Sequence, residues 1–247
     1  MKIIFISDLH LAPHTIDKNL LFFSFLQHWI QRIDALYILG DFFDFWVGDD
    51  DDNPFTQQIK LELNKFSQHT PIYFIGGNHD FAVGKAFAKQ SGIQLLRDLA
   101  TLEINGKRLL LSHGDIFCTL DLSYQRMKKI LQNPLTIFLL RRLPLKLRYK
   151  IKETLSSKAK NHNQTHRQAE YTYQVVADSV IAAALKANAS IVIHGHTHRP
   201  GYYPLNSRDG SIIERYEIPD WEERLAGGYL LWEQGHITLE HYQNTKD

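Results

Sequence analysis

The amino-acid sequence predicts one α/β domain over residues 1–247, built on a mostly parallel β-sheet and elaborated by a helical insert over about 121–187. Two observations predict it. Short runs of Ile, Val, Leu and Phe alternate with segments whose apolar residues recur at helical spacing, a rhythm typical of a sheet covered on both faces. Within the insert the helical spacing continues alone, broken at Pro134 and Pro144, and strands return after it.

The individual elements follow this rhythm along the chain. Runs that are apolar throughout, such as "ALYILG" (35–40), are typical of strands buried on both faces. The Asn105-Gly106 pair favours a tight turn between two strands. In chain order we expect a strand at 2–7, a helix at 17–32, a strand at 35–40, a helix at 55–69, a strand at 71–76, a hairpin within 101–115, the insert, and strands at 190–195, 212–218, 227–233 and 236–242.

Composition excludes several classes of protein. The chain is 44% hydrophobic and 22% charged, and its formal net charge of +1 gives no overall attraction to nucleic acid. The single Cys118 excludes a disulfide framework and suits a reducing cytosol. No run approaches the roughly 18 apolar residues of a membrane-spanning helix, and the opening "MKIIFISDLHL" is too short for a secretory signal.

The insert is basic and amphipathic. Residues 126–167 hold twelve Lys or Arg and one acid, Glu153. Within them, "PLTIFLLRRLPLKLRYKIKETL" (134–155) interleaves Leu, Ile and Phe with Arg and Lys, which suits an anionic membrane surface or a groove for acyl chains. The alternative is a helical hairpin whose apolar face packs on the domain while its basic residues are solvated.

Polar residues directly follow each of several predicted strands. Because the carboxyl ends of parallel strands share one edge of a sheet, we expect these side chains to meet there. They are Asp8 and His10; Asp41 and Asp44; Asn78, His79 and Asp80; His113 and Asp115; and His194, His196 and His198.

This group of residues has the chemistry of a metal centre. Imidazole and carboxylate together suit Mn, Fe, Zn or Co, and the roughly six or seven ligands are too many for one tetrahedral site. We therefore expect two divalent ions that share one carboxylate and assist in-line attack at phosphorus. Asp41 is the natural bridge. His194 still belongs to its apolar run and is expected to pack or to support a ligand, whereas His196 and His198 lie beyond the strand end.

Ordinary structural roles are the competing interpretation. A single Asp after a strand is more often a helix N-cap or a turn residue, and a lone His is more often a satisfied polar group. The conjunction of so many strand ends favours the metal centre. The run "VGDDDD" (47–52) is expected to be a solvated acidic loop, with Asp44 a candidate support for a ligand.

In this order the residues resemble the signature of the calcineurin-like metallophosphoesterases: D-x-H, G-D-x-x-D, G-N-H-D/E, a later H, and G-H-x-H. The resemblance implies a four-layer αββα sandwich with paired sheets and a dinuclear site. One ion would be held by Asp8, His10, Asp41 and His198, and the other by Asp41, Asn78, His113 and His196.

From residue 1 to about 200, stretches such as "SDLHL", "DALYILGD", "WVGDDD" and "IHGHTHRP" are similar to the UDP-2,3-diacylglucosamine hydrolases of lipid A biosynthesis. The resemblance implies a Mn-dependent enzyme, peripheral on the cytoplasmic face of a bacterial inner membrane. It would hydrolyse the pyrophosphate of UDP-2,3-diacylglucosamine to UMP and 2,3-diacylglucosamine 1-phosphate, through a metal-bridging hydroxide that attacks the α-phosphorus.

The same resemblance implies a set of residues that bind substrate. His79 stands where these hydrolases carry arginine, and it is expected to donate a proton to the leaving phosphate or to stabilise charge at phosphorus. Gln164 stands where they carry lysine, with Arg167 as a candidate replacement. The full expected set is Asn78, His79, Asp121, Ser157, Asn161, Gln164, Arg167 and His196, with His79 and Asp41 as the catalytic residues.

Two other functions fit these residues. A metallophosphoesterase for a soluble nucleotide or nucleotide-sugar pyrophosphate would use the same metal centre and be indifferent to acyl chains. A nuclease or nucleic-acid-binding module would use the basic helices. Against the second, the basic segment is interleaved with Leu and Phe rather than with stacking Tyr or Trp, and the net charge is low.

Overall fold

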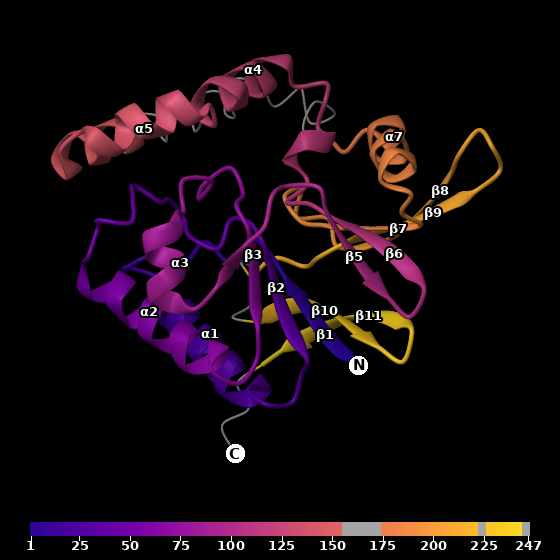
Figure 1. Cartoon of the computed structure of the whole chain (residues 1–247), viewed down its shortest axis with the longest axis horizontal. Helices are drawn as coiled ribbons and strands as arrows, with labels where there is room; N and C mark the ends of the chain where they lie inside the picture. The colour runs from indigo at the N-terminus through magenta and orange to yellow at the C-terminus, as the bar shows by residue number, and fades with distance from the viewer. Residues whose placement is uncertain (155–173, 222–225, 244–247) are drawn as a thin grey trace.

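The strands form a six-stranded and a five-stranded sheet in the computed structural model, which describes residues 1–154, 174–221 and 226–243 (Figure 1). The first sheet has the order β11-β10-β1-β2-β3-β4 and the second the order β5-β6-β7-β9-β8. The strands are β1 (Lys2–Ile6), β2 (Ala35–Leu39), β3 (Ile72–Ile75), β4 (Gln94–Leu95), β5 (Ala100–Ile104), β6 (Lys107–Leu111), β7 (Ile191–His194), β8 (Gly201–Asn206), β9 (Ile212–Glu217), β10 (Gly227–Glu233) and β11 (His236–Tyr242).

Both sheets are mixed. β1 to β4 run parallel, and β10 and β11 join them in antiparallel pairing. In the second sheet the β6–β7 and β7–β9 pairs are parallel, while β5 and β8 complete it as antiparallel hairpin partners. The carboxyl ends of β1, β2 and β3 therefore form one edge, and those of β6 and β7 form a second.

The two sheets pack face to face, with helices on the outside. Along β1, alternate side chains face opposite layers: Ile4 and Ile6 pack against α1 (Ile16–Trp29), α2 (Pro54–Ser67) and α3 (Lys85–Ser91). Ile3 and Phe5 pack instead against β6 and β7 of the second sheet. The outer face of that sheet is covered by α7 (Ala177–Ala187). These are the four layers of an αββα sandwich.

The α/β class and the four-layer sandwich are confirmed. The paired sheets implied by the resemblance are present, whereas the mostly parallel sheet predicted from the alternating runs is incomplete, since the strands divide between two mixed sheets. A run of apolar residues shows that both faces of a strand are buried, but it does not show whether a helix or another sheet buries them. The sequence also gave no expectation of α3, β4 or β8. The first two are short, and β8 is an edge strand that contains Pro204.

The insert begins after a short 3-10 turn, η1 (Asp115–Phe117), as α4 (Leu122–Leu131) and α5 (Pro134–Arg142), and residues 145–154 are also helical. The two predicted breaks are confirmed: Pro134 occupies the first turn of α5, and Pro144 directly precedes the next helical stretch. Residues 155–173 lie outside the described part of the chain, so the full extent of the insert stays a prediction, as does the division into one domain.

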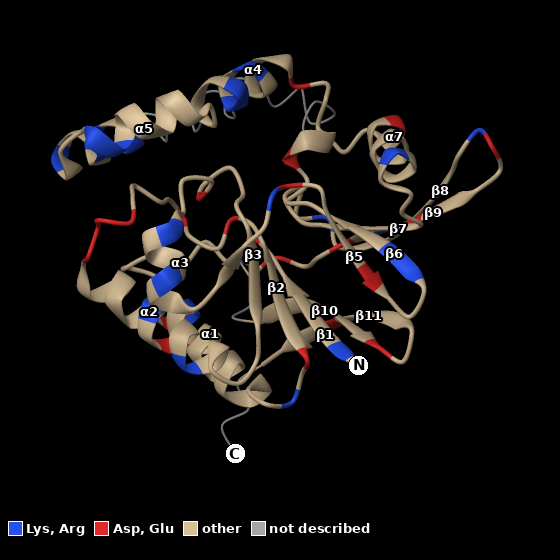
Figure 2. Cartoon of the chain, in the orientation of Figure 1, with Lys and Arg blue, Asp and Glu red and all other residues tan. Residues whose placement is uncertain are grey.

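The acidic loop at 47–52 is not simply solvated, which corrects that expectation. Figure 2 shows basic residues gathered on α4 and α5, and acidic residues on the loop that leads into α2. Asp50 pairs with Arg148, which is only 6% exposed and also donates to the Val47 carbonyl at 2.9 Å. Tyr149 donates to Asp51 at 2.5 Å. The loop therefore fixes the helical stretch 145–154 of the insert.

In the described part of the chain, no helix has the length and apolar character needed to cross a lipid bilayer.

Replacing Arg148 with Ala should loosen this attachment, because the Asp50 carboxylate and the Val47 carbonyl lose a common charged donor. Such a hydrogen bond contributes about 1.5–3 kcal/mol, so backbone hydrogen exchange within 145–154 should become roughly tenfold faster or more. Hydrogen–deuterium exchange with mass spectrometry measures this. Lys150→Ala, at an exposed basic position of the same helical stretch, is the control. Equal exchange in both variants would contradict the anchoring role.

Candidate metal centre

The carboxyl ends of strands from both sheets deliver the predicted residues to one place. Asp8 and His10 follow β1, Asp41 follows β2, and their loops are joined by hydrogen bonds from the Asp8 and His10 amides to the carbonyls of Gly40 and Asp41. The same cluster receives side chains that follow β3, β6 and β7. Five of the non-glycine residues in these loops have positive φ, a conformation that costs about 1–2 kcal/mol each and persists where surrounding contacts impose it. They are Asp8, His10, Asp41, His196 and His198.

Asp41 lies at the centre of the cluster. Its Oδ2 is 3.5 Å from Nε2 of His113, and 3.9 Å from Nε2 of both His10 and His79. Asn78 Oδ1 lies 3.0 Å from the same nitrogen of His113. Among the residues that the structure describes, three groups have ligand atoms that all lie within 4.8 Å of one another: Asp8, His10 and His198; His10, Asp41 and His79; and Asp41, His113 and His196.

This donor set fits divalent metal ions. Each group combines imidazole nitrogen with carboxylate oxygen, the mixture that suits Mn, Fe, Zn or Co. Oδ1 of Asp8 is buried and accepts no hydrogen bond from any described residue, which leaves its lone pairs available to an ion. Asp41 belongs to two of the three groups. The individual ligand assignments stay predictions.

The loop that carries Asp41 is held by Asp80. This buried carboxylate accepts hydrogen bonds from the amides of Gly77 at 2.7 Å, Asp41 at 3.3 Å, Phe42 at 2.8 Å and Phe43 at 3.2 Å. Gly77 packs so closely that a Cβ there would lie 2.2 Å from Oδ1 of Asp41. The "GGNHD" segment therefore fixes Asp41 as well as supplying Asn78 and His79.

Burial opposes charge throughout the cluster, and neighbouring groups decide the outcome. Asp8 is buried, yet the neighbouring imidazoles of His198, whose Nε2 lies 3.6 Å from Oδ1, and of His113 hold its pKa well below the ordinary range. His113 is also buried, but the carboxylates of Asp41 and Asp8 raise its pKa to about 9. Burial lowers the pKa of His196 to about 4. Without metal, protonated His113 therefore balances part of the carboxylate charge.

His194 and His79 occupy different surroundings. His194 is buried, donates from Nδ1 to the Gly195 carbonyl at 2.8 Å, and packs against Phe117, while burial lowers its pKa to about 3. It lies outside the three metal-ligand groups, in keeping with a packing role. His79 is partly exposed, and its Nδ1 donates to the Asp44 carbonyl at 2.5 Å, which points Nε2 at Asp41. Asp44 thus contributes through its backbone.

The expected substrate contacts divide into two sets. Asn78, His79 and His196 lie in the cluster, whereas Asp121 caps α4 by accepting from the Tyr124 amide at 2.9 Å. A contact between Asp121 and substrate stays a prediction. The other expected positions, Ser157, Asn161, Gln164 and Arg167, lie outside the described residues.

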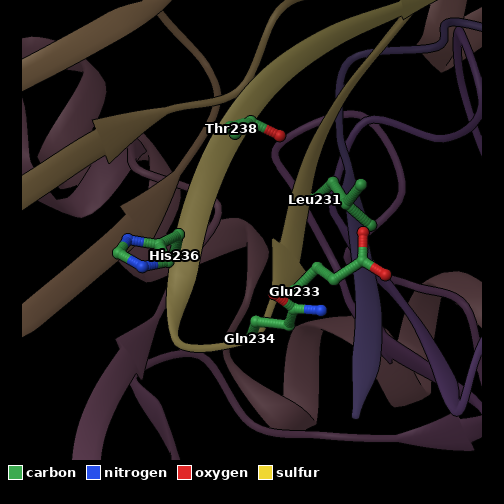
Figure 3. Close-up of a pocket in the computed structure, with 5 residues that line it drawn as sticks. All are labelled: Leu231, Glu233, Gln234, His236 and Thr238. Carbon is green, nitrogen blue, oxygen red and sulfur yellow. The ribbon is translucent and has the colours of Figure 1, made fainter.

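The pocket in Figure 3 is separate from this cluster. It has a volume of about 290 Å³ and is lined by Leu231, Glu233, Gln234, His236 and Thr238. Glu233 lies opposite Lys2 in the β1–β10 pairing, so the pocket sits at the amino end of β1. The predicted metal ligands follow the carboxyl end of that strand.

Residues 1–200 match a family model described as calcineurin-like phosphoesterase. The chain belongs to this family. A UDP-2,3-diacylglucosamine hydrolase of Pseudomonas fluorescens (strain SBW25) is 39% identical over 223 residues, which cover 90% of this chain and 88% of that protein. One of the same name from Vibrio cholerae serotype O1 (strain ATCC 39541 / Classical Ogawa 395 / O395) is 38% identical over 248 residues, covering 97% of this chain and 100% of that protein.

A solved archaeal phosphodiesterase aligns with 98% of this chain and 100% of its own, at a TM-score of 0.47 and 14% identity. The expected resemblance to proteins named UDP-2,3-diacylglucosamine hydrolase is confirmed by the two relatives above. The phosphoesterase is accordingly a metal-dependent hydrolase.

The structure gives supporting roles to polar residues of the phosphoesterase that lie outside the predicted ligand set. Asp115 is buried and accepts from Tyr124 Oη at 2.5 Å and Lys128 Nζ at 2.8 Å, which ties α4 to the loop that carries His113. Asp220 and Glu217 contact the loop after β7. A charged residue at the end of a buried strand was the available signal for Glu217; Asp220 had none.

Glu217 should make the stability of the phosphoesterase depend on pH. Burial raises its pKa from 4.5 to about 7, so the folded chain holds a proton that the unfolded chain releases above pH 4.5. The contribution is fully present below pH 4.5 and is lost as pH rises through 7. In chelator, the free energy of unfolding of wild type should therefore fall relative to Glu217→Gln between pH 5 and 8, by about 3 kcal/mol at most. Urea denaturation measures it; a constant difference would contradict the prediction.

Proposed function

We propose that this phosphoesterase hydrolyses the pyrophosphate bond of UDP-2,3-diacylglucosamine, giving UMP and 2,3-diacylglucosamine 1-phosphate, with two divalent ions, most suitably Mn²⁺. The observation that carries the proposal is the position of Asp41, whose Oδ2 lies 3.5–3.9 Å from imidazole nitrogens that follow strands of both sheets. The relatives named for this reaction support the choice of substrate.

Each ion would take ligands from one side of Asp41. Asp8, His10 and His198 would complete one site with Asp41. Asn78, His113 and His196 would complete the other, and Asn78 is already 3.0 Å from His113. When bound, the two ions supply a hydroxide for in-line attack on the α-phosphorus and neutralise charge that develops on the phosphate.

The protein's own groups orient the reaction. Asp80 and Gly77 hold Asp41 between the two sites. His79 has Nδ1 engaged by the Asp44 carbonyl, so its Nε2 faces the cluster and can give a proton to the leaving phosphate or stabilise its charge. The strand ends of the two sheets thus present ligands and a proton donor to the same phosphate.

The insert supports an acylated substrate over a soluble one. α4 and α5 bury none of their residues, and Ile130, Leu135 and Leu139 are 64%, 65% and 56% exposed. This exposure favours an acyl-chain or membrane surface on these two helices over an apolar face packed on the domain. Exposed Leu and Ile beside Arg141 and Arg142 suit acyl chains and an anionic membrane surface, and less a nucleic acid, which favours stacking aromatics. A peripheral position on the cytoplasmic face of a bacterial inner membrane is consistent with such a surface.

The direct test is UMP release by the purified protein with added Mn²⁺, comparing UDP-2,3-diacylglucosamine with UDP-N-acetylglucosamine at equal concentration. Release from the acylated sugar alone is expected, and chelator should abolish it. Equal release from both sugars would favour the alternative of a phosphoesterase for soluble nucleotide pyrophosphates. No release from either would contradict the proposed substrate class.

His79→Ala should lower turnover by about 100-fold, the contribution of a positioned proton donor, while the metal content stays near that of wild type. UMP release and elemental analysis of the same preparation give both quantities. His69→Ala is the matched control, because His69 is exposed and lies before the amino end of β3. Loss of bound metal in His79→Ala would instead make His79 a ligand.

A further inference from the structure

The loop after β7 carries two predicted ligands on a strained backbone. His196 has φ +80° and His198 has φ +54°, left-handed conformations that residues with a side chain rarely adopt. The loop leaves β7 at Gly195, and its direction must be imposed by contacts with the rest of the fold. The first loop amides are held elsewhere, Gly195 by the His113 carbonyl at 2.8 Å and His196 by Oδ2 of Asp8 at 2.9 Å. The contacts around His198 come from β9 and the residues that follow it.

Glu217 holds the backbone of this loop. In the parallel β7–β9 pairing it lies beside His194, where the loop begins. Its Oε1 accepts from the Thr197 hydroxyl at 2.5 Å and from the Arg199 amide at 2.9 Å. Glu217 is 1% exposed, so both bonds are shielded from water. One buried carboxylate therefore joins residues on either side of His198.

A second set of contacts keeps Glu217 in place. Arg215 lies on the same face of β9, with Nη2 3.9 Å from Oε2 of Glu217. Its guanidinium stacks on the Tyr203 ring, 4.0 Å from the ring centre. The Tyr203 hydroxyl donates to the Arg199 carbonyl at 2.9 Å. The Arg199 residue is thus held at its amide by Glu217 and at its carbonyl by Tyr203.

Asp220 holds the ring of His198. Its Oδ2 lies 2.7 Å from Nδ1 of His198, while Nε2 of that ring lies 3.6 Å from Oδ1 of Asp8. A carboxylate on one ring nitrogen fixes the tautomer and leaves the other nitrogen for metal. The next residue, Trp221, is buried and donates its amide to the Asp8 carbonyl at 3.2 Å. Asp220 is therefore fixed relative to the ligands it serves.

We propose that Glu217 and Asp220, which lie beyond the part of the chain matched by the family model, are positioning residues for the metal centre: Glu217 fixes the loop that carries His196 and His198, and Asp220 fixes the ring of His198 alone. Glu217 therefore acts on both ions and Asp220 on one. This inference rests on the two-ion site of the proposed function.

The test is calorimetric titration of Mn²⁺ into the metal-free, full-length protein. Wild type should bind two ions. Asp220→Ala should lower the affinity for one ion by about 10- to 100-fold and leave the affinity for the other unchanged. Asp220→Asn keeps an acceptor for Nδ1 and should recover most of the lost affinity. Glu214→Ala is the control, because Glu214 lies on the same strand with its side chain on the opposite face from Glu217.

Glu217→Leu should lower the affinity for both ions by a similar factor. Glu217→Gln should keep both affinities, because its amide oxygen can accept the same two hydrogen bonds. Thr197→Val, which removes one donor without changing shape, replaces Glu217→Leu if the latter does not fold. Unfolding in chelator separates positioning from a general loss of stability. The proposal would be overturned if Asp220→Ala and Thr197→Val bound Mn²⁺ with wild-type affinity. It would also be overturned if Asp220→Ala lowered the affinity for both ions equally. Fewer than two ions in wild type would overturn the two-ion site itself.

Discussion

The carboxylate of Asp41 must be reached by histidines from two different sheets, and most of the fold can be understood from this constraint. His10 comes from the loop after β1 in the six-stranded sheet, and His113 from the loop after β6 in the five-stranded one. Only a tight, apolar interface between the sheets keeps those loops at a fixed separation. That interface is built by fully buried side chains such as Phe5, Leu111 and Ile193, so core packing sets the geometry of the polar cluster.

Forming the cluster also costs free energy, and the surrounding polar contacts offset that cost. Buried carboxylates and imidazoles lie together on loops with positive φ, which burial and strain both disfavour. Asp80 collects four backbone donors around Asp41, and Glu217 collects two donors around His198. These supporting carboxylates hold the loops that carry Asp41 and His198 in place. The geometry of the cluster thus rests on carboxylates outside the predicted ligand set.

The sequence predicted the strands and the residues at their ends well, because both are local properties. A strand buried on both faces and the polar residue that ends it are visible within ten residues or so. The division into two sheets was implied only by the family resemblance, since local pattern carries no information on which strand lies opposite. The same limit applies to the acidic loop, whose Asp50 finds its partner Arg148 at a sequence separation of 98 residues, and to the pairing of Asp220 with His198. Long-range partners become visible only when the chain is folded.

The measurement that tests the account most directly is X-ray diffraction from Mn²⁺-soaked crystals at the manganese edge, where anomalous scattering locates each ion. The account predicts two peaks about 3.5–4 Å apart, both in contact with the carboxylate of Asp41. One peak alone, or a second ion that does not touch Asp41, would contradict it.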